Sequence, residues 1–306
     1  MKVLLTGATG FIGSFLLKKL VAEGHEVVIL ARLKSQFYRI EDVINNITII
    51  YTDYFNLNEC ETEIMDFNPE VVYHIGWLGV ENTMHNDESL LFKNIQSTLS
   101  LVKVIIKCNV KVVVALGSQA EYGPYRCFIN ETQSANPTSL YGIAKLSAYN
   151  IFRYYLNANN IRLVWLRLFS SYGPSDNPNW LIPYLIRTIA EGKSPALTKG
   201  EQIWDYLYID DVVSAIMACV NTKNASGLFN LGSGIGYSLK SIITQIRDII
   251  DPNISLGFGE VEYRTDQVMV LQADNTKLRL ETNWFPHVQL DEGLRITINW
   301  FLNNLK

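Results

Sequence analysis

The stretch Met1-Lys-Val-Leu-Leu-Thr-Gly-Ala-Thr-Gly-Phe-Ile-Gly13 decides the fold of this chain. Its apolar run Val-Leu-Leu predicts a short buried strand, and Gly7, Gly10 and Gly13 follow directly. Apolar residues then recur at helical spacing as far as Gly24, a natural helix stop. The stretch therefore predicts a strand, a tight turn and a helix in immediate succession.

Each of the three glycines has a physical role in such a turn. Gly7 allows the tight turn off the strand, Gly10 lets the backbone approach a pyrophosphate, and Gly13 lets the helix lie against the sheet. The helix start then offers free N–H groups and the positive end of its dipole to the phosphates. We predict dinucleotide binding, with cofactor contacts from Gly7, Thr9, Gly10, Phe11, Ile12 and Gly13.

Composition excludes several classes of protein. The 306 residues are 48% hydrophobic and 18% charged, as in ordinary globular proteins, and the net charge of −4 gives no electrostatic case for binding nucleic acid or an anionic membrane. No apolar run approaches the roughly 20 residues that span a bilayer. The chain enters its first strand at once, so we expect no signal peptide. The four cysteines have no paired spacing, so no disulfide or metal site is predicted and a reduced cytoplasm fits.

The next two strands carry candidates for the adenosine end of the cofactor. A second strand at 25–31 is followed by Arg32, where relatives of this architecture commonly place an acidic residue for the ribose 2′-hydroxyl. An arginine there suits a 2′-phosphate, so NADP(H) is preferred and NAD(H) is the alternative; a solvated arginine at a strand end is the plainer interpretation. A third strand at 47–51 precedes Asp53 and Tyr54, and the Asp53 carboxylate could hold the adenine amino group.

The fourth and fifth strands, 71–76 and 111–116, bring further residues to the cofactor. His74 is interpreted as a structural histidine, and the polar loop 78–89 borders the substrate. An amphipathic helix is predicted over 94–107. The remaining predicted cofactor contacts are Ile75, Gly76, Trp77, Asn94, Leu116 and Leu168, together with Tyr141 and Lys145.

The chemistry follows the fifth strand. Ser118 lies at a polar, glycine-bounded strand exit, and a helix over 139–157 carries Tyr141 and Lys145 four residues apart, on one face. A lysine ammonium beside a tyrosine favours phenolate and lowers its pKa, which suits general acid–base catalysis. Ser118 would hydrogen-bond the same substrate oxygen. The predicted catalytic residues are Ser118, Tyr141 and Lys145.

Taken together, these motifs resemble the extended short-chain dehydrogenase/reductases, the NAD(P)-dependent sugar-nucleotide epimerases, dehydratases and reductases. The resemblance rests on the glycine triplet, Ser118, the Tyr-x-x-x-Lys pair, the stretch 167–174 and the segments 200–213, 230–234 and Arg264. It implies an α/β Rossmann-type doubly wound parallel sheet with a smaller α/β domain for the nucleotide sugar. We assign 1–169 and 205–225 to the first domain and 170–204 and 226–306 to the second, with the segment 206–220 rejoining the main sheet.

The resemblance also implies a homodimer. Relatives pair the two helices 94–107 and 139–157 across a twofold axis as a four-helix bundle. Apolar positions beyond one core-facing stripe favour this arrangement, and the alternative is that they face only the sheet. These positions are Leu99, Leu101, Val102, Ile105 and Ile106 on one helix and Tyr149, Phe152, Tyr154 and Tyr155 on the other.

Departures from the family pattern narrow the function. Gln119 and Ala120 replace the Asp-Glu pair of enzymes that dehydrate at C4–C6, so that reaction is not expected. Ser170 stands where the family has asparagine, and Trp204, a hydrophobic plug or a stacking surface, stands where it has a phosphate-binding arginine. The predicted substrate contacts are Ser118, Gln119, Ser170, Asn179, Lys199, Gln202, Trp204 and Arg264.

The segments 200–202 and 257–264 are similar to those of CDP-abequose-type synthases, which reduce a 4-keto group on a nucleotide-linked deoxyhexose. The resemblance therefore favours a cytoplasmic reductase of a nucleotide-activated 4-keto-deoxyhexose. A nucleotide-sugar 4-epimerase with the same Ser-Tyr-Lys set is the first alternative, and a non-catalytic NAD(P)-binding regulator is the second. The sequence does not name the nucleotide or the sugar.

Overall fold

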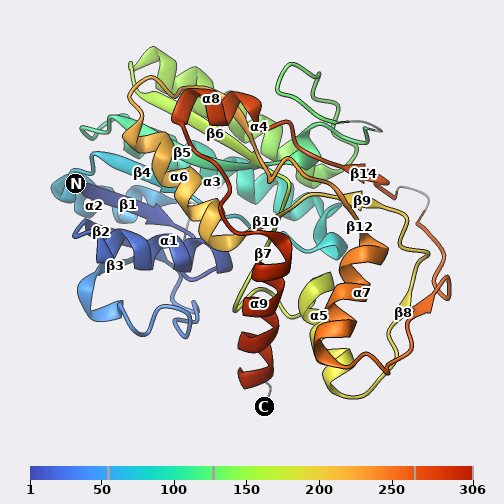
Figure 1. The fold of residues 1–306 in the computed structure, drawn as a ribbon. Coiled ribbons are helices and arrows are strands. Elements are labelled where there is room, and N and C mark those ends of the chain that lie inside the picture. Colours follow the sequence, from blue (N-terminus) through green and yellow to red (C-terminus); the bar gives the residue numbers. More distant parts are fainter. Residues whose placement is uncertain (54–55, 126–127, 265–266, 305–306) are drawn as a thin grey trace.

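A seven-stranded parallel sheet forms the centre of the molecule, in the strand order β11–β6–β5–β4–β1–β2–β3 (Figure 1). The structure, a computed structural model, describes residues 1–53, 56–125, 128–264 and 267–304. The strands of the sheet are β1 (Lys2–Thr6), β2 (Glu26–Ala31), β3 (Thr48–Tyr51), β4 (Val71–His74), β5 (Val112–Ser118), β6 (Arg162–Leu168) and β11 (Gly227–Leu231). The predicted doubly wound α/β fold is confirmed.

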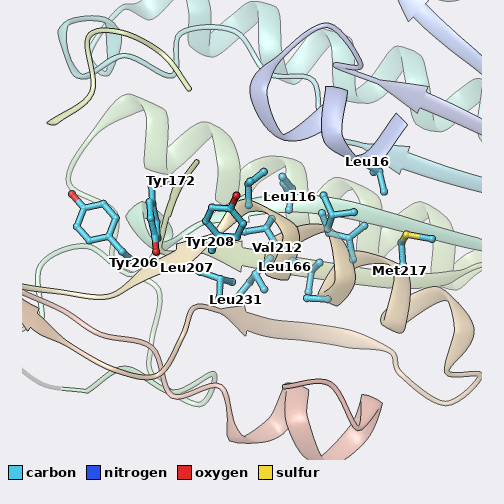
Figure 2. Packing of buried hydrophobic residues seen from close by; sticks show 14 of the residues in the cluster. Leu16, Leu116, Leu166, Tyr172, Tyr206, Leu207, Tyr208, Val212, Met217 and Leu231 are labelled. Atoms are coloured by element: carbon cyan, nitrogen blue, oxygen red, sulfur yellow. The ribbon is translucent and has the colours of Figure 1, made fainter. Parts of the chain in front are cut away.

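Helices cover both faces of this sheet, because alternate residues of each buried strand point to opposite sides. Val3 and Leu5 of β1 join an apolar cluster with α1 and α6, whereas Leu4 joins another with α2, α3 and α4. In Figure 2, Leu16 of α1 and Met217 of α6 are two members of the first cluster. The helices around the sheet are α1 (Phe11–Ala22), α2 (Glu61–Phe67), α3 (Glu88–Ile105), α4 (Leu140–Ala158) and α6 (Ile209–Asn221).

Apart from α6 and β11, most of the chain after β6 forms a second region beside the carboxyl ends of the sheet strands (Figure 1). Three of its helices, α5, α7 and α9, pack on one another. Its short strands form the pairs β10–β7 and β13–β8 and the three-stranded sheet β12–β9–β14. The elements are β7 (Ser170–Tyr172), α5 (Leu181–Ala190), β8 (Ala196–Leu197), β9 (Ile203–Trp204), β10 (Tyr206–Tyr208), β12 (Tyr237–Ser238), α7 (Leu239–Ile250), β13 (Gly257–Phe258), β14 (Val270–Leu271) and α9 (Leu290–Asn304). The short helix α8 (Thr276–Thr282) packs instead against β11 of the main sheet.

The strand expected to rejoin the main sheet, at 206–208, does not do so. As β10 it pairs with β7, and Tyr172 of β7 packs edge-on against Tyr206 and Tyr208 with ring centroids 6.0 and 5.6 Å apart (Figure 2). The strand that extends the sheet is β11, although its residues fall in the range 226–306 predicted for the second domain. Its side chains Phe229 and Leu231 are fully buried beside β6, and this burial favours β11 as the edge strand.

The helix predicted over 94–107 begins earlier, at Glu88. The side chain of Asp87 accepts hydrogen bonds from the backbone N–H groups of Ser89 and Leu90 at 2.8 and 3.3 Å and caps a polar first turn. Short 3-10 turns add η1 (Ile44–Asn46), η2 (Leu57–Glu59), η3 (Asn82–Met84) and η4 (Gln119–Glu121). Within the described ranges, no helix has both the length and the apolarity to cross a membrane.

Candidate active site

A cavity of about 1140 Å³ lies between the carboxyl ends of the sheet strands and the second region. Open parallel sheets bind their ligands at this edge, because the loops that leave the strands converge there. Its walls come from the β1–α1 turn, the loop after β4, the exit of β5, the first turns of α4 and the segment from β7 into α5. The cavity therefore joins the two predicted domains.

The β1–α1 turn leaves no room for side chains. A Cβ on Gly13 would lie 2.0 Å from the carbonyl oxygen of Gly7, and a Cβ on Gly7, whose φ is +76°, would lie 2.5 Å from the backbone nitrogen of Gly76. Gly10, the N-cap of α1, supplies no capping side chain, so the first N–H groups of the helix remain available. These features fit the diphosphate of a dinucleotide.

Most of the predicted cofactor residues line this cavity. Asp53 is not among the residues in its wall, and Tyr54 lies outside the described residues. The side chain of Asn94 holds the loop after β4, because it accepts from the backbone N–H of Leu78 at 3.1 Å and donates to its carbonyl at 3.0 Å. Those in the wall are Gly7, Thr9, Gly10, Phe11, Ile12, Gly13, Arg32, Ile75, Gly76, Trp77, Asn94, Leu116, Tyr141, Lys145 and Leu168.

Arginine side chains occupy the end of the cavity beside β2. Arg32 is exposed, and its backbone N–H donates to the Ser35 hydroxyl at 3.0 Å in a turn that follows the strand. Arg39 lines the same end, and its Nε donates to the carbonyl oxygen of Ser175 at 3.0 Å, which bridges the two sides of the cleft. This end of the cavity therefore carries positive charge.

The predicted catalytic residues meet in the middle of the cavity. Ser118 ends β5, and its hydroxyl lies close enough to the Tyr141 side chain of α4 to act on the pKa of the phenol. The Lys145 Nζ donates to the carbonyl oxygen of Leu116 at 2.7 Å and lies 3.9 Å from the centroid of the Trp77 ring. A substrate oxygen placed between Ser118 and Tyr141 would have two hydroxyl groups within reach.

The expected lowering of the Tyr141 pKa by Lys145 is not found. Burial raises the pKa of Tyr141 to about 12, and the Ser118 hydroxyl opposes this only in part. The lysine ammonium is instead engaged by the Leu116 carbonyl and the Trp77 ring. Burial also lowers the pKa of Lys145 to about 7, and the negative charge of Glu121 acts against that shift.

His74 behaves as a buried structural group. Burial, and secondarily the charge of Lys145, lowers the pKa of His74 to about 3, so its imidazole is neutral at physiological pH. Its Nδ1 shares a hydrogen bond with the Thr6 hydroxyl at 2.9 Å. This environment fits the structural histidine that the sequence predicted.

Only part of the predicted substrate set reaches the cavity. Ser118, Gln119, Ser170, Asn179 and Trp204 line it, whereas Lys199, Gln202 and Arg264 are absent from its wall. Lys199 is exposed, and the buried Gln202 donates to the Thr198 hydroxyl at 3.2 Å. Arg264 lies close enough for its charge to lower the pKa of His85, after the larger effect of burial. Lys199 and Gln202 therefore lie outside the wall of this cavity.

Trp204 combines the two roles that the sequence left open. Its indole Nε1 donates to the carbonyl oxygen of Val268 at 3.2 Å, and its ring packs 6.1 Å from that of Tyr206. It belongs to the apolar packing between the regions, and the same side chain lines the cavity. Trp204 is therefore a plug that also presents an aromatic surface.

Three residues at the site were missed by the sequence reasoning. Glu121 is fully buried behind β5, His85 stacks on Tyr141, and Asp176 is a buried carboxylate in the cavity wall. Only Glu121 had a local signal: Ser118 and Glu121 have the spacing of a capping box, which they form. His85 and Asp176 lie in irregular segments where no periodicity points to a partner.

A family model described as "NAD dependent epimerase/dehydratase family" matches residues 3–232. The chain belongs to this family. The solved structure of UDP-glucose 4-epimerase with UDP-glucose from Thermotoga maritima is 26% identical, with a TM-score of 0.91 and full coverage of both chains. UDP-glucuronic acid 4-epimerase from Bacillus cereus, solved with UDP-glucuronic acid and NAD, is 25% identical with a TM-score of 0.88 and covers 99% of this chain and 100% of its own.

The family also contains a relative of the kind that the sequence resembles. CDP-abequose synthase of Salmonella typhimurium is 28% identical over 306 residues, which cover 95% of each chain. UDP-glucose 4-epimerase of Mycolicibacterium smegmatis is 26% identical over 317 residues, which cover 99% of each. The predicted family is confirmed, and its members include synthases and epimerases alike.

Proposed function

We propose that this protein is an NADPH-dependent reductase of a nucleotide-activated 4-keto-deoxyhexose. The observation that carries the proposal is the convergence of Ser118, Tyr141 and Lys145 in one cavity with the glycine turn of α1. When bound, the nicotinamide would supply the hydride for C4. The Ser118 hydroxyl would hold the 4-keto oxygen, and Tyr141 would protonate it, with Lys145 holding the cofactor ribose.

The reductase assignment draws on what stands beside Ser118 and on the relatives. Gln119 lines the cavity and Ala120 follows it, so the acid and base that eliminate water from C4–C6 are missing at these two positions. CDP-abequose synthase, with 95% of each chain covered, supports a deoxyhexose substrate. Arg32, Ser35 and Arg39 at one end of the cavity support NADP(H) as the preferred cofactor.

A 4-epimerase is the second candidate, because three of the four relatives described above are UDP-sugar 4-epimerases with nearly full coverage. An epimerase retains its cofactor and returns the hydride to the other face, so it consumes none. Incubation with CDP-, dTDP- and UDP-linked 4-keto-6-deoxyhexoses should oxidise one NADPH per sugar if the proposal holds. Interconversion of UDP-glucose and UDP-galactose without net cofactor oxidation would show instead that the protein is a 4-epimerase. Binding of the cofactor without turnover of either set of substrates would indicate a non-catalytic NAD(P)-binding regulator.

A cytoplasmic homodimer through α3 and α4 completes the proposal. Leu101, Val102, Ile105 and Phe152 are buried inside the subunit, so the alternative that they face the sheet holds for them. The outer faces nevertheless expose Phe92 by 67% and Tyr154 by 72%. Two copies could cover these rings symmetrically. Sedimentation should show a dimer at micromolar concentration that Phe92→Lys dissociates; a monomeric parent protein would refute it.

A further inference from the structure

Glu121 is a carboxylate with no access to solvent, placed directly behind the candidate catalytic residues. Its Oε1 accepts from the backbone N–H of Ser118 at 2.8 Å and from the indole N–H of Trp165 at 3.0 Å. Its Oε2 accepts from Nε of Arg167 at 2.7 Å. Three donors from two strands therefore hold one buried charge, which is the condition under which a buried carboxylate is tolerated.

The end of β5 is shaped around this carboxylate. A Cβ on Gly117 would lie 2.5 Å from Oε1 of Glu121 and 2.2 Å from the indole nitrogen of Trp165. The residues on either side belong to the candidate catalytic machinery: Leu116 accepts the hydrogen bond of the Lys145 ammonium, and Ser118 bears the hydroxyl. The absence of a side chain at Gly117 thus lets the Glu121 carboxylate approach the strand between Leu116 and Ser118 of the candidate site.

Among the residues that the structure describes, the ionisable groups placed against the Lys145 ammonium are Glu121 from η4, His74 from β4 and, one turn earlier on its own helix, Tyr141. His74 is neutral, and burial disfavours the charged form of the lysine, so Glu121 is the group that opposes deprotonation. Arg167 forms an ion pair with the other oxygen of the Glu121 carboxylate, and its guanidinium carbon lies 4.1 Å from the centroid of the Tyr122 ring.

We propose that Glu121 is a positioning residue for the reaction: it fixes the backbone that carries Ser118 and supplies a buried negative charge that favours the ammonium form of Lys145. The proposal rests on the proposed function of the cavity, because it assigns Lys145 a charged role there. Neither role requires Glu121 to touch the substrate. Its effect on turnover passes through Ser118 and Lys145.

Glu121→Gln separates charge from shape, since the amide oxygen can still accept from the Ser118 N–H. Protein labelled with ¹³Cε-lysine is titrated by NMR, and the Lys145 signal is assigned by its loss in Lys145→Met. We expect the Lys145 pKa to fall by about one unit or more in Glu121→Gln. With cofactor and 4-keto sugar, kcat should decrease and its alkaline limb should move to lower pH, while the KM for the cofactor changes little.

Two further variants exclude a merely structural role. Arg167→Gln breaks the same ion pair but keeps the carboxylate, so the Lys145 pKa should not fall as it does in Glu121→Gln. Glu131→Gln is the matched control, because Glu131 is a partly buried carboxylate that accepts from the backbone N–H of Asn230 at 2.8 Å, away from Lys145. If Glu121→Gln does not fold, the double variant Glu121→Gln with Arg167→Leu removes both charges of the ion pair together and should still lower the Lys145 pKa.

An unchanged Lys145 titration in Glu121→Gln, or equal shifts in Glu121→Gln and Arg167→Gln, would overturn the proposal. The titration needs no substrate, so it is independent of the reductase assay. A parent protein that turns over no 4-keto sugar but shows the Lys145 shift would refute the proposed function and support the electrostatic role of Glu121.

Discussion

The imidazole of His85 stacks face to face on the phenol of Tyr141, with ring centroids 4.4 Å apart and planes inclined by 11°. The two residues are also joined through the backbone, because the N–H of Tyr141 donates to the carbonyl oxygen of His85 at 2.8 Å. The His85 Nε2 lies 3.2 Å from the Val80 carbonyl oxygen, which anchors the ring within its own loop. The loop after β4 therefore covers the phenol and restricts its orientation.

Replacement of His85 tests whether this stacking positions the phenol. His85→Ala should lower kcat several-fold, since an aromatic pair contributes about 0.5–1.5 kcal/mol beyond its burial. His85→Phe keeps the flat ring and should recover most of the loss, because the proposed role needs no proton. Steady-state kinetics measures kcat for both His85 variants, with His25→Ala as a control remote from the cavity. Equal losses in the Ala and Phe variants would show that the imidazole itself is required.

Tyr141→Phe removes one hydroxyl and leaves the ring. Turnover should fall by roughly 10²–10⁴, the usual contribution of a positioned acid–base group, with folding and cofactor binding retained. NADPH oxidation is measured beside the circular dichroism spectrum, and Tyr154→Phe, an exposed tyrosine of the same helix, is the control. Near-normal turnover by folded Tyr141→Phe would contradict the proposed mechanism.

Lys145→Met should impair two steps at once. The ammonium is expected to hold the cofactor ribose and to support the phenol, so kcat should fall and the Kd for NADPH should rise. Fluorescence titration with NADPH and single-turnover kinetics measure the two effects separately. Lys103→Met, an exposed lysine of α3, should change neither. A Lys145 variant with unaltered cofactor affinity would remove the ribose contact from the mechanism.

Cofactor preference should depend on Arg32. A guanidinium can pair with both oxygens of a 2′-phosphate, and hydrogen bonds to charged groups contribute about 1.5–3 kcal/mol, so Arg32→Asp should weaken NADPH binding about tenfold or more relative to NADH. Calorimetric titration of both cofactors measures the ratio. Lys34→Asp makes the same charge change at an exposed side chain outside the cavity wall. Tighter binding of NADH by the parent protein would reverse the prediction.

The buried carboxyl of Asp176 should make stability depend on pH. Burial raises its pKa from 3.8 to about 7 in the folded chain, so folding favours the protonated form. The stability that this group contributes is complete below its unfolded pKa and is lost as pH rises through about 7. Between pH 4 and pH 8 the protein should lose up to about 4 kcal/mol relative to Asp176→Asn.

Urea unfolding of the two proteins at both pH values measures this difference. The amide of Asp176→Asn can still accept from the backbone N–H of Asn177, a bond of 2.7 Å in the parent. Asp274→Asn is the control, because the carboxylate of the less buried Asp274 also accepts a local backbone hydrogen bond, from the N–H of Thr276 at 2.9 Å. If the free energy of unfolding changed with pH to the same extent in the parent and in Asp176→Asn, the pH dependence could not be attributed to the Asp176 carboxyl.

The sequence by itself determined the features whose partners lie close along the chain. The glycines of Met1–Gly13 act within a single turn, and Tyr141 and Lys145 share a face because a helix repeats every 3.6 residues. The family, the parallel sheet and the meeting of Ser118, Tyr141 and Lys145 followed from such local patterns together with the resemblance. Local geometry suffices there because few conformations satisfy it.

Only the tertiary structure decided the features that depend on distant pairing and burial. β10 and β11 are both short and apolar, and which of them joins β6 depends on packing against the whole sheet. Likewise, desolvation within the site raises the pKa of Tyr141 where the neighbouring lysine alone would lower it. The contacts of Glu121 with Arg167 and of His85 with Tyr141 join residues 46 and 56 positions apart, and chain spacing carries no signal for such pairs because their distance is set by how the layers pack.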